Sequence, residues 1–293
     1  MLDNNGAILI AIFWDSVGGT VEFRYRLKYE GAVADQNVLP AHAGAQSLEG
    51  ITWSFSLLTN YLVTGEIRHR GALDPRMKVY ISPPARGSFI TDVTIFLTQP
   101  ESLFLTSVLG TYAVSTAGNA FNSFVTYAFK RVCGVFDQGD EDMLKALNKF
   151  PSGDLEANLD AIEPSMTRAH SVIGDGAERL LITKPRAPVT ELNGTTKAYI
   201  QTDQKADDPS EHEVGVGALN VNQGSGRVFF QALGKTVPFQ VVKEPDAGTY
   251  TTLSWSLDQY ARGLESTIKI KCIEVYSIDG RIKRFIILSA TRI

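Results

Sequence analysis

Apolar and polar residues alternate along several stretches of the first hundred residues. The segment 20–29, TVEFRYRLKY, has an apolar or aromatic side chain at every second position, the period of a strand with one buried face. Residues 77–82 and 87–98 are strand-like as well, and the continuous apolar run 6–14 is typical of a buried strand. Glycines at 18–19 predict a tight turn between the first two strands. The pattern therefore predicts two β-hairpins.

A helical spacing replaces the alternation between these hairpins. In residues 47–64 the apolar side chains recur three and four positions apart, which predicts an amphipathic helix. A hairpin, a helix and a second hairpin can form one sheet with the helix on one face. We therefore expect an α+β domain over residues 1–101.

Residues 102–129 carry no charged side chain, and Lys130 and Arg131 follow directly. A run of this length is a candidate membrane helix, and cations at its end are typical of a cytoplasmic flank. Its hydrophobicity is only moderate, because Ser, Thr, Asn and Gly are spread along it. The alternative is a helical hairpin buried in a large protein core and bent at residues 116–118. Both interpretations remain open, and we treat 102–131 as a separate segment.

Uncharged polar residues in this segment recur every three or four positions, so a single helix would align them in one stripe. Such a stripe suits contacts between helices in lipid or the wall of a water-filled pore. One helix cannot enclose a pore, so this hypothesis requires a homo-oligomer. The predicted pore-lining residues are Ser107, Thr111, Ser115, Asn119, Asn122 and Thr126.

The middle of the chain changes character twice. Residues 132–183 contain helical patterns, with an interruption expected near Pro164. Residues 184–213 combine prolines with a polar, acidic stretch, which is typical of a linker.

From residue 214 onward the alternation returns. Turn signals at 224–226 and 279–280 separate strand-like stretches, and residues 253–264 predict one short helix. Several short strands with a single helix are typical of a small barrel, such as an OB-like or SH3-like module. We expect a β module over residues 214–293.

The charge distribution distinguishes this module from the rest of the chain. Residues 227–293 contain ten Lys/Arg and six Asp/Glu, whereas the whole chain has a net charge of −4. The overall balance argues against a general nucleic-acid binder, but the basic module indicates a local anionic ligand. The alternative is an uneven surface charge without a ligand. The predicted ligand-binding residues are Arg227, Lys235, Arg281, Lys283 and Arg284, with Phe230 and Tyr260 available for base stacking.

The chain contains no recognisable catalytic or metal-binding motif. Its four histidines are scattered, its two cysteines lack a metal-ligand spacing, and no nucleophile-elbow or phosphate-loop sequence occurs. We therefore predict no catalytic residue, no metal site and no cofactor, and a protein that is not an enzyme. An unrecognised hydrolase is the remaining alternative.

The order of the charge-free segment and the basic module around Arg227, Lys283 and Arg284 resembles membrane effectors of bacterial anti-phage defence. It is most similar in outline to the effector subunit of Hailong-type systems. The resemblance implies an oligomeric pore in the bacterial inner membrane with cytoplasmic domains, gated by a nucleotide or short single-stranded DNA that a partner nucleotidyltransferase makes. The alternative function is a cytoplasmic regulatory or defence protein without a membrane segment, which binds nucleic acid or a partner protein.

Overall fold

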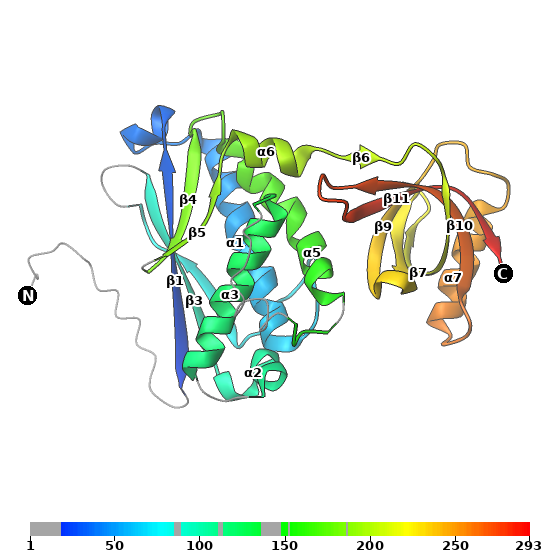
Figure 1. The fold of residues 1–293 in the computed structure, drawn as a ribbon, viewed down its shortest axis with the longest axis horizontal. Helices are drawn as coiled ribbons and strands as arrows, with labels where there is room; N and C mark the ends of the chain where they lie inside the picture. Colours follow the sequence, from blue (N-terminus) through cyan, green and yellow to red (C-terminus); the bar gives the residue numbers. More distant parts are fainter. Residues whose placement is uncertain (1–18, 85–88, 111–113, 136–147, 152, 186) are drawn as a thin grey trace, which may run out of the picture.

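A computed structural model describes residues 19–293 except 85–88, 111–113, 136–147, 152 and 186. An antiparallel sheet, a layer of helices and a small barrel follow one another along its longest axis (Figure 1). Two separate hydrophobic cores correspond to this arrangement, one from Phe23 to Ile200 and one from Val214 to Ala290. The protein is therefore an α+β protein of two domains, joined by a short connector.

The sheet of the first domain has the order β2-β3-β1-β4-β5, with every neighbouring pair antiparallel. Its strands are β1 (Thr20–Glu30), β2 (Met77–Ile81), β3 (Ile90–Thr98), β4 (Arg179–Lys184) and β5 (Ala187–Leu192). The alternation in β1 is confirmed, because its aromatic and leucine positions are buried and the residues between them are mostly exposed. The expected strand at 6–14 lies outside the described residues.

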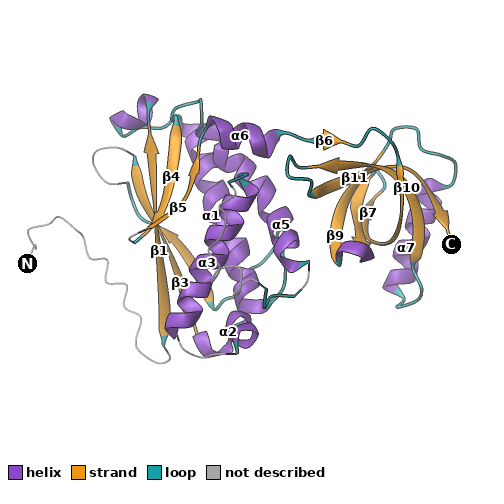
Figure 2. Ribbon diagram, in the orientation of Figure 1, coloured by secondary structure: helices purple, strands orange, loops and turns teal. Residues whose placement is uncertain are grey.

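The α-helices described for this domain lie on one side of its sheet (Figure 2). They are α1 (Ala41–Thr64), α2 (Phe104–Leu109), α3 (Val114–Val132), α5 (Asp154–Ala169) and α6 (Gly194–Gln201). Short 3-10 turns cover Ala32–Gln36, Pro100–Ser102 and His170–Val172. The helix expected at 47–64 is confirmed, and it begins six residues earlier. The predicted interruption at Pro164 is wrong, since α5 continues through that residue.

The charge-free run is not the single helix that a membrane span would require. Helix α2 ends at Leu109, and Gly110 follows with a φ of 64°, a left-handed conformation that favours glycine; α3 begins at Val114. The break therefore lies at Gly110 and not at 116–118, as expected for the buried alternative. Among the helices of the described residues, none combines the length and the apolar character needed to cross a bilayer.

Burial in the protein core accounts for the missing charges in α3. Phe121 stacks on Phe23 of β1 with ring centroids 3.9 Å apart, and Phe129 packs on Phe55 of α1 at 4.8 Å. A charged side chain on this face would lose its hydration without gaining a partner. An uncharged segment is therefore compatible with this protein core as well as with a lipid bilayer.

The residues of the predicted polar stripe do not share one environment. Ser107 and Asn119 are exposed, whereas Asn122 points inward and accepts a hydrogen bond of 2.8 Å from the Tyr25 hydroxyl. The hydroxyl oxygen of Thr126 is buried and has no hydrogen-bond partner among the described residues. Thr111 and the side chain of Ser115 lie outside the described residues. The prediction of one continuous stripe is therefore wrong for the described positions. The helix is interrupted at Gly110, and Asn122 is hydrogen-bonded to Tyr25.

Three of the predicted segments need correction. The first domain does not end at residue 101, because β4 and β5 complete its sheet and Ile200 of α6 belongs to its core. The segment 184–213 is not simply a linker, since β5 and α6 lie within it. Pro188 fits in β5 because that strand is at the sheet edge, where an amide donor is not required. Residues 132–183 likewise contain β4 besides helix.

The C-terminal module is a five-stranded barrel, as its alternation predicts. The strands β7 (Ser210–Asn220), β8 (Ser225–Phe230), β9 (Lys235–Val241), β11 (Ile282–Arg292) and β10 (Thr267–Tyr276) pair in this order, and β10 closes the barrel on β7. The pair β9–β11 is parallel and the others are antiparallel. The short strand β6 (Gln204–Lys205) adds to β10, a 3-10 turn covers Gln231–Leu233, and α7 (Thr249–Ala261) confirms the expected helix.

His170 predicts a pH dependence of the first domain. Its ring is fully buried, Nδ1 donates 2.7 Å to the Met166 carbonyl, and Nε2 accepts 3.0 Å from the Thr196 hydroxyl. Burial lowers the pKa of His170 to about 4, below the ~6.5 of an unfolded chain. The unfolded state therefore binds the proton more readily, so stability is full above pH 6.5 and falls as the pH drops towards 4.

We expect the His170 contribution to the free energy of unfolding to fall by about 2 kcal/mol between pH 7 and pH 5. Urea unfolding of wild type and of His170→Gln at both pH values gives the change in the free energy of unfolding of each protein between pH 7 and pH 5. The difference between these two changes is the His170 contribution. His42→Gln, at an exposed position, should respond as wild type does. Equal pH responses of wild type and His170→Gln would contradict this assignment.

Candidate functional site

Helix α5 presents two chemically different faces. Leu159, Ile162 and Met166 are buried in the core of the first domain. Glu156, Asp160 and Glu163, spaced four and three residues apart, form an acidic row on another face. This row is turned to the barrel, which lies beyond α5 in Figure 1.

Asp160 lies at the centre of the contact between the two domains. Its carboxylate accepts a hydrogen bond of 2.9 Å from Nζ of Lys235 and one from the guanidinium of Arg281. The side chain of Lys235 is 0% exposed, and those of Asp160 and Arg281 are each 7% exposed. The barrel therefore inserts two buried cations against one buried carboxylate of α5.

Two further carboxylates extend this contact. Glu163 bonds Arg281 at 2.6 Å and Lys283 at 2.7 Å. Asp203, in the connector after α6, bonds Lys283 at 2.7 Å and Arg284 at 2.6 Å. We call the group Asp160, Glu163, Asp203, Lys235, Arg281, Lys283 and Arg284 the boundary network.

Two opposing electrostatic effects act on the pKa of Asp160, in the buried part of this network. Desolvation of the carboxyl raises the pKa of Asp160, and Arg281 and Lys235 act in the opposite direction. Charges in such a place lose hydration that their partners only partly replace. We therefore expect the pairing to fix the position of the barrel more than it adds net stability.

The predicted ligand-binding residues are only partly brought together. Lys235, Arg281, Lys283 and Arg284 converge on α5 and the connector, whereas Arg227 of β8 is not part of this network. Their role in binding a ligand stays a prediction. Phe230 is 8% exposed and packs against Phe285 inside the barrel, where it cannot stack on a base. Tyr260 is 62% exposed, but it belongs to α7, on the side of the barrel away from α5 (Figure 1).

Sequence reasoning missed the acidic half of the boundary network. Asp160 and Arg281 are 121 residues apart, so no local pattern relates them. The detectable signal was the acidic row itself, because three carboxylates at helical spacing on one face are compatible with a cationic neighbour. Nothing comparable identifies Asp203.

A serine–histidine–glutamate group in the barrel also escaped the sequence analysis. Oγ of Ser210 is 3.1 Å from Nε2 of His212, and the same nitrogen is 2.6 Å from the Glu274 carboxylate. A proton relay requires the carboxylate and the nucleophile on different ring nitrogens. Here both share Nε2, so this geometry does not activate Ser210.

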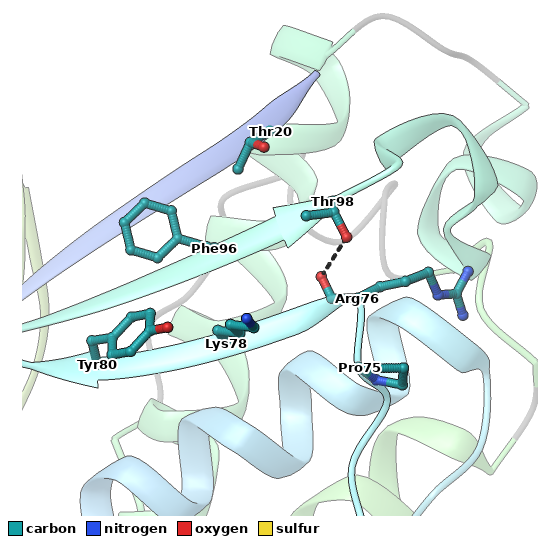
Figure 3. Close-up of a pocket in the computed structure, with 7 residues that line it drawn as sticks. All are labelled: Thr20, Pro75, Arg76, Lys78, Tyr80, Phe96 and Thr98. Atoms are coloured by element: carbon teal, nitrogen blue, oxygen red, sulfur yellow. Dashed lines mark hydrogen bonds between the residues drawn. The ribbon is translucent and has the colours of Figure 1, made fainter. Parts of the chain in front are cut away.

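The outer face of the first sheet carries a small pocket of about 110 Å³ (Figure 3). Tyr80 and Phe96 form one side, with ring centroids 5.8 Å apart, and Thr98 and Pro75 lie at its other end. The Arg76 guanidinium turns away from it and bonds Asp74 at 2.9 Å. The pocket offers aromatic surface, but these residues supply little to orient a ligand, so the boundary network is the stronger candidate site.

Fold and site define a two-domain α+β protein whose domains meet at an ionic surface. Residues 25–201 match the family described as "Domain of unknown function (DUF7946)", and residues 208–291 match the "Family of unknown function (DUF7947)". The first match covers more than half of the chain, so the protein belongs to the DUF7946 family. The gap between the two matches falls in the connector that holds Asp203. No curated protein matches the chain.

Proposed function

We propose that this protein is a non-enzymatic regulatory effector that senses an anionic ligand, a nucleotide or short single-stranded DNA, at the boundary between its two domains. One observation carries the proposal. Four cations that the sequence singles out for an anionic ligand gather at this boundary, and each is held by a carboxylate of the first domain or the connector.

A ligand would regulate the protein by competing with the carboxylates for these cations. A phosphodiester presents the same kind of anionic oxygen as Asp203 or Glu163, so it can replace them on Lys283 and Arg284. Replacement removes contacts that hold the barrel on α5, which couples ligand binding to the domain arrangement. Exchange of one anion for another suits such a role, since the cations keep an anionic partner throughout and no buried charge is left uncompensated.

The pore function is a separate hypothesis and stays a prediction. It would require α3 to leave the core, which would expose Phe121, Phe124 and Phe129. The bacterial defence setting, a homo-oligomer, a partner nucleotidyltransferase and the inner-membrane or cytoplasmic location likewise stay predictions from the resemblance. The described contacts favour the alternative function, regulation by ligand or partner binding.

The test is a fluorescence anisotropy titration of labelled single-stranded DNA and of cyclic nucleotides at ~50 and ~200 mM salt. We expect binding that weakens with salt, because each neutralised phosphate releases a counterion. Arg284→Glu should weaken binding by tenfold or more, since a charge-assisted contact contributes about 1.5–3 kcal/mol. Arg284 is the appropriate position because it is the most exposed cation of the network, at 43%.

Arg262→Glu is the matched control. It changes the net charge equally, but Arg262 follows α7 and pairs with the exposed Asp258. It should leave the affinity within about twofold of wild type. Absence of binding at low salt, or equal losses in the two variants, would refute the proposed ligand site.

A further inference from the structure

Strand β8 turns one of two adjacent aromatic side chains into the barrel and the other one out of it. Phe230 belongs to the barrel core, whereas Phe229 is 46% exposed. Val228 also lies in the core, so the alternation of a strand places Arg227 and Phe229 together on the outer surface of β8. The aromatic side chain that solvent reaches is therefore one position away from the Phe230 that the sequence analysis selected for base stacking.

The cross-strand neighbours of Phe229 leave its ring uncovered. They are Gly215 of β7 on one side and Thr236 of β9 on the other. Glycine has no side chain and threonine has a short one, so neither can lie over the face of the ring. A Cβ at Gly215 would have one neighbour within 4 Å among the described residues, Oγ of Ser266 at 3.4 Å. Phe229 thus lies on a surface of small residues.

Two arginines share this outer surface. Arg227 lies opposite Pro238 of β9. The parallel pairing of Phe285 with Phe239 puts Arg284 of β11 beside Pro238 on its other side. Because both phenylalanines lie in the barrel core, the residues that precede them face outward. Neighbouring strands are about 4.8 Å apart, so Arg227 and Arg284 flank Pro238 with about 10 Å between their strands.

This combination of groups matches the chemistry of single-stranded nucleic acid. Arginine binds backbone phosphates through its planar fork of N–H donors, and an exposed aromatic ring stacks on an unpaired base. Solvent reaches both kinds of group, since the side chain of Arg284 is 43% exposed and Phe229 is 46% exposed. A double helix keeps its bases stacked on each other and offers none to a single ring. An exposed phenylalanine alone is ordinary, but one beside two arginines indicates a ligand with both phosphates and bases.

We propose that Phe229 stacks on a base of single-stranded nucleic acid, while Arg227 and Arg284 bind its phosphates on either side of β9. The inference rests on the proposed function for the class of ligand. It adds the position of a base and the path of the strand across β8, β9 and β11. It also explains a preference for single strands over duplex.

Anisotropy titrations with a short labelled oligo(dT) test the stacking residue. Phe229→Leu should weaken binding by about fivefold or more, because base–aromatic stacking contributes at least about 1 kcal/mol per base. The slope of log affinity against log salt should stay as in wild type, since no phosphate contact is lost. Arg227→Gln should instead lower that slope by about 1. The position of Phe229 is exposed, so the Tm of Phe229→Leu should equal that of wild type.

Tyr260→Leu is the matched control, because it removes another exposed aromatic ring, on α7. It should leave the affinity for oligo(dT) unchanged. An abasic strand has the same phosphates and no bases, so it should bind equally to wild type and Phe229→Leu. Phe229→Trp should keep the affinity for oligo(dT), and its added fluorescence should be quenched by oligo(dT) but not by the abasic strand.

The outcomes separate this inference from the proposed function. If oligo(dT) binds equally to wild type and Phe229→Leu, or if that variant loses the abasic strand to the same extent, the stacking assignment is wrong and the proposed function stands. If binding depends on Phe229 but Arg284→Glu leaves it unchanged, stacking stands and the ligand site at the boundary network fails. If oligo(dT) does not bind wild type at low salt, both fail.

Discussion

Replacing Asp160 by alanine is expected to lower the free energy of unfolding by about 3–5 kcal/mol. The variant leaves Lys235, 0% exposed, and Arg281, 7% exposed, buried without their shared carboxylate. Removing one partner of a buried ion pair has a cost of this size, because Arg281 then keeps only Glu163, which it shares with Lys283, and Lys235 keeps only the half-exposed Glu156. Urea denaturation followed by circular dichroism measures the loss.

Asp258→Ala is the control for Asp160→Ala. Asp258 pairs with Arg262 four residues later, and both side chains are largely exposed, so its loss should be about 0.5 kcal/mol or less. In the Asp160→Ala background, Lys235→Met with Arg281→Met should restore most of the lost stability, since no buried charge is then stranded. A loss below about 1 kcal/mol for Asp160→Ala would mean that water reaches these cations.

Gly50→Ala should destabilise the first domain by about 3 kcal/mol or more. A Cβ at this position would lie 2.3 Å from the Ser165 carbonyl oxygen and 2.5 Å from the Ala169 amide nitrogen. Both are backbone atoms of α5, so the clash can be relieved only if α1 and α5 move apart. That movement disrupts the packing of the core between them. Chemical denaturation gives the loss in the free energy of unfolding.

Gly118→Ala is the matched substitution in α3. Its Cβ would meet only the Phe23 ring, at 3.8 Å, which is an ordinary contact. Alanine in a helix interior is favoured over glycine, so we expect a gain of about 0.5–1 kcal/mol. A similar loss at both positions would contradict the close crossing of α1 and α5.

The local elements were predictable because their signals are local. Alternation in β1 and helical spacing in α1 depend on which face of one element is buried, and residues two to four positions apart record this directly. The sheet order was not predictable, since Arg26 of β1 pairs with Thr183, far along the chain. Pro188 indicated a linker for the same reason, because the edge position of β5 is a property of the whole sheet.

The charge-free run shows a real ambiguity in sequence. A protein interior and a lipid bilayer exclude charged side chains for the same reason, the loss of hydration. What separates them here is tertiary contact, such as the hydrogen bond of Asn122 with Tyr25 and the stacking of Phe121 on Phe23. The sequence identified the cations of the candidate site but not their carboxylate partners. A basic cluster has the same sequence pattern whether its partner is a ligand or a neighbouring helix.

The closure of the barrel by β11 has a consequence for synthesis on the ribosome. Strand β11 pairs with both β9 and β10, so the barrel cannot close before β11 emerges. The first domain is complete by the end of α6, some eighty residues earlier. During that interval the nascent chain displays the acidic row of α5 with no barrel to cover it. Asp160 and Glu163 are then fully hydrated, and their desolvation is deferred until the late strands dock.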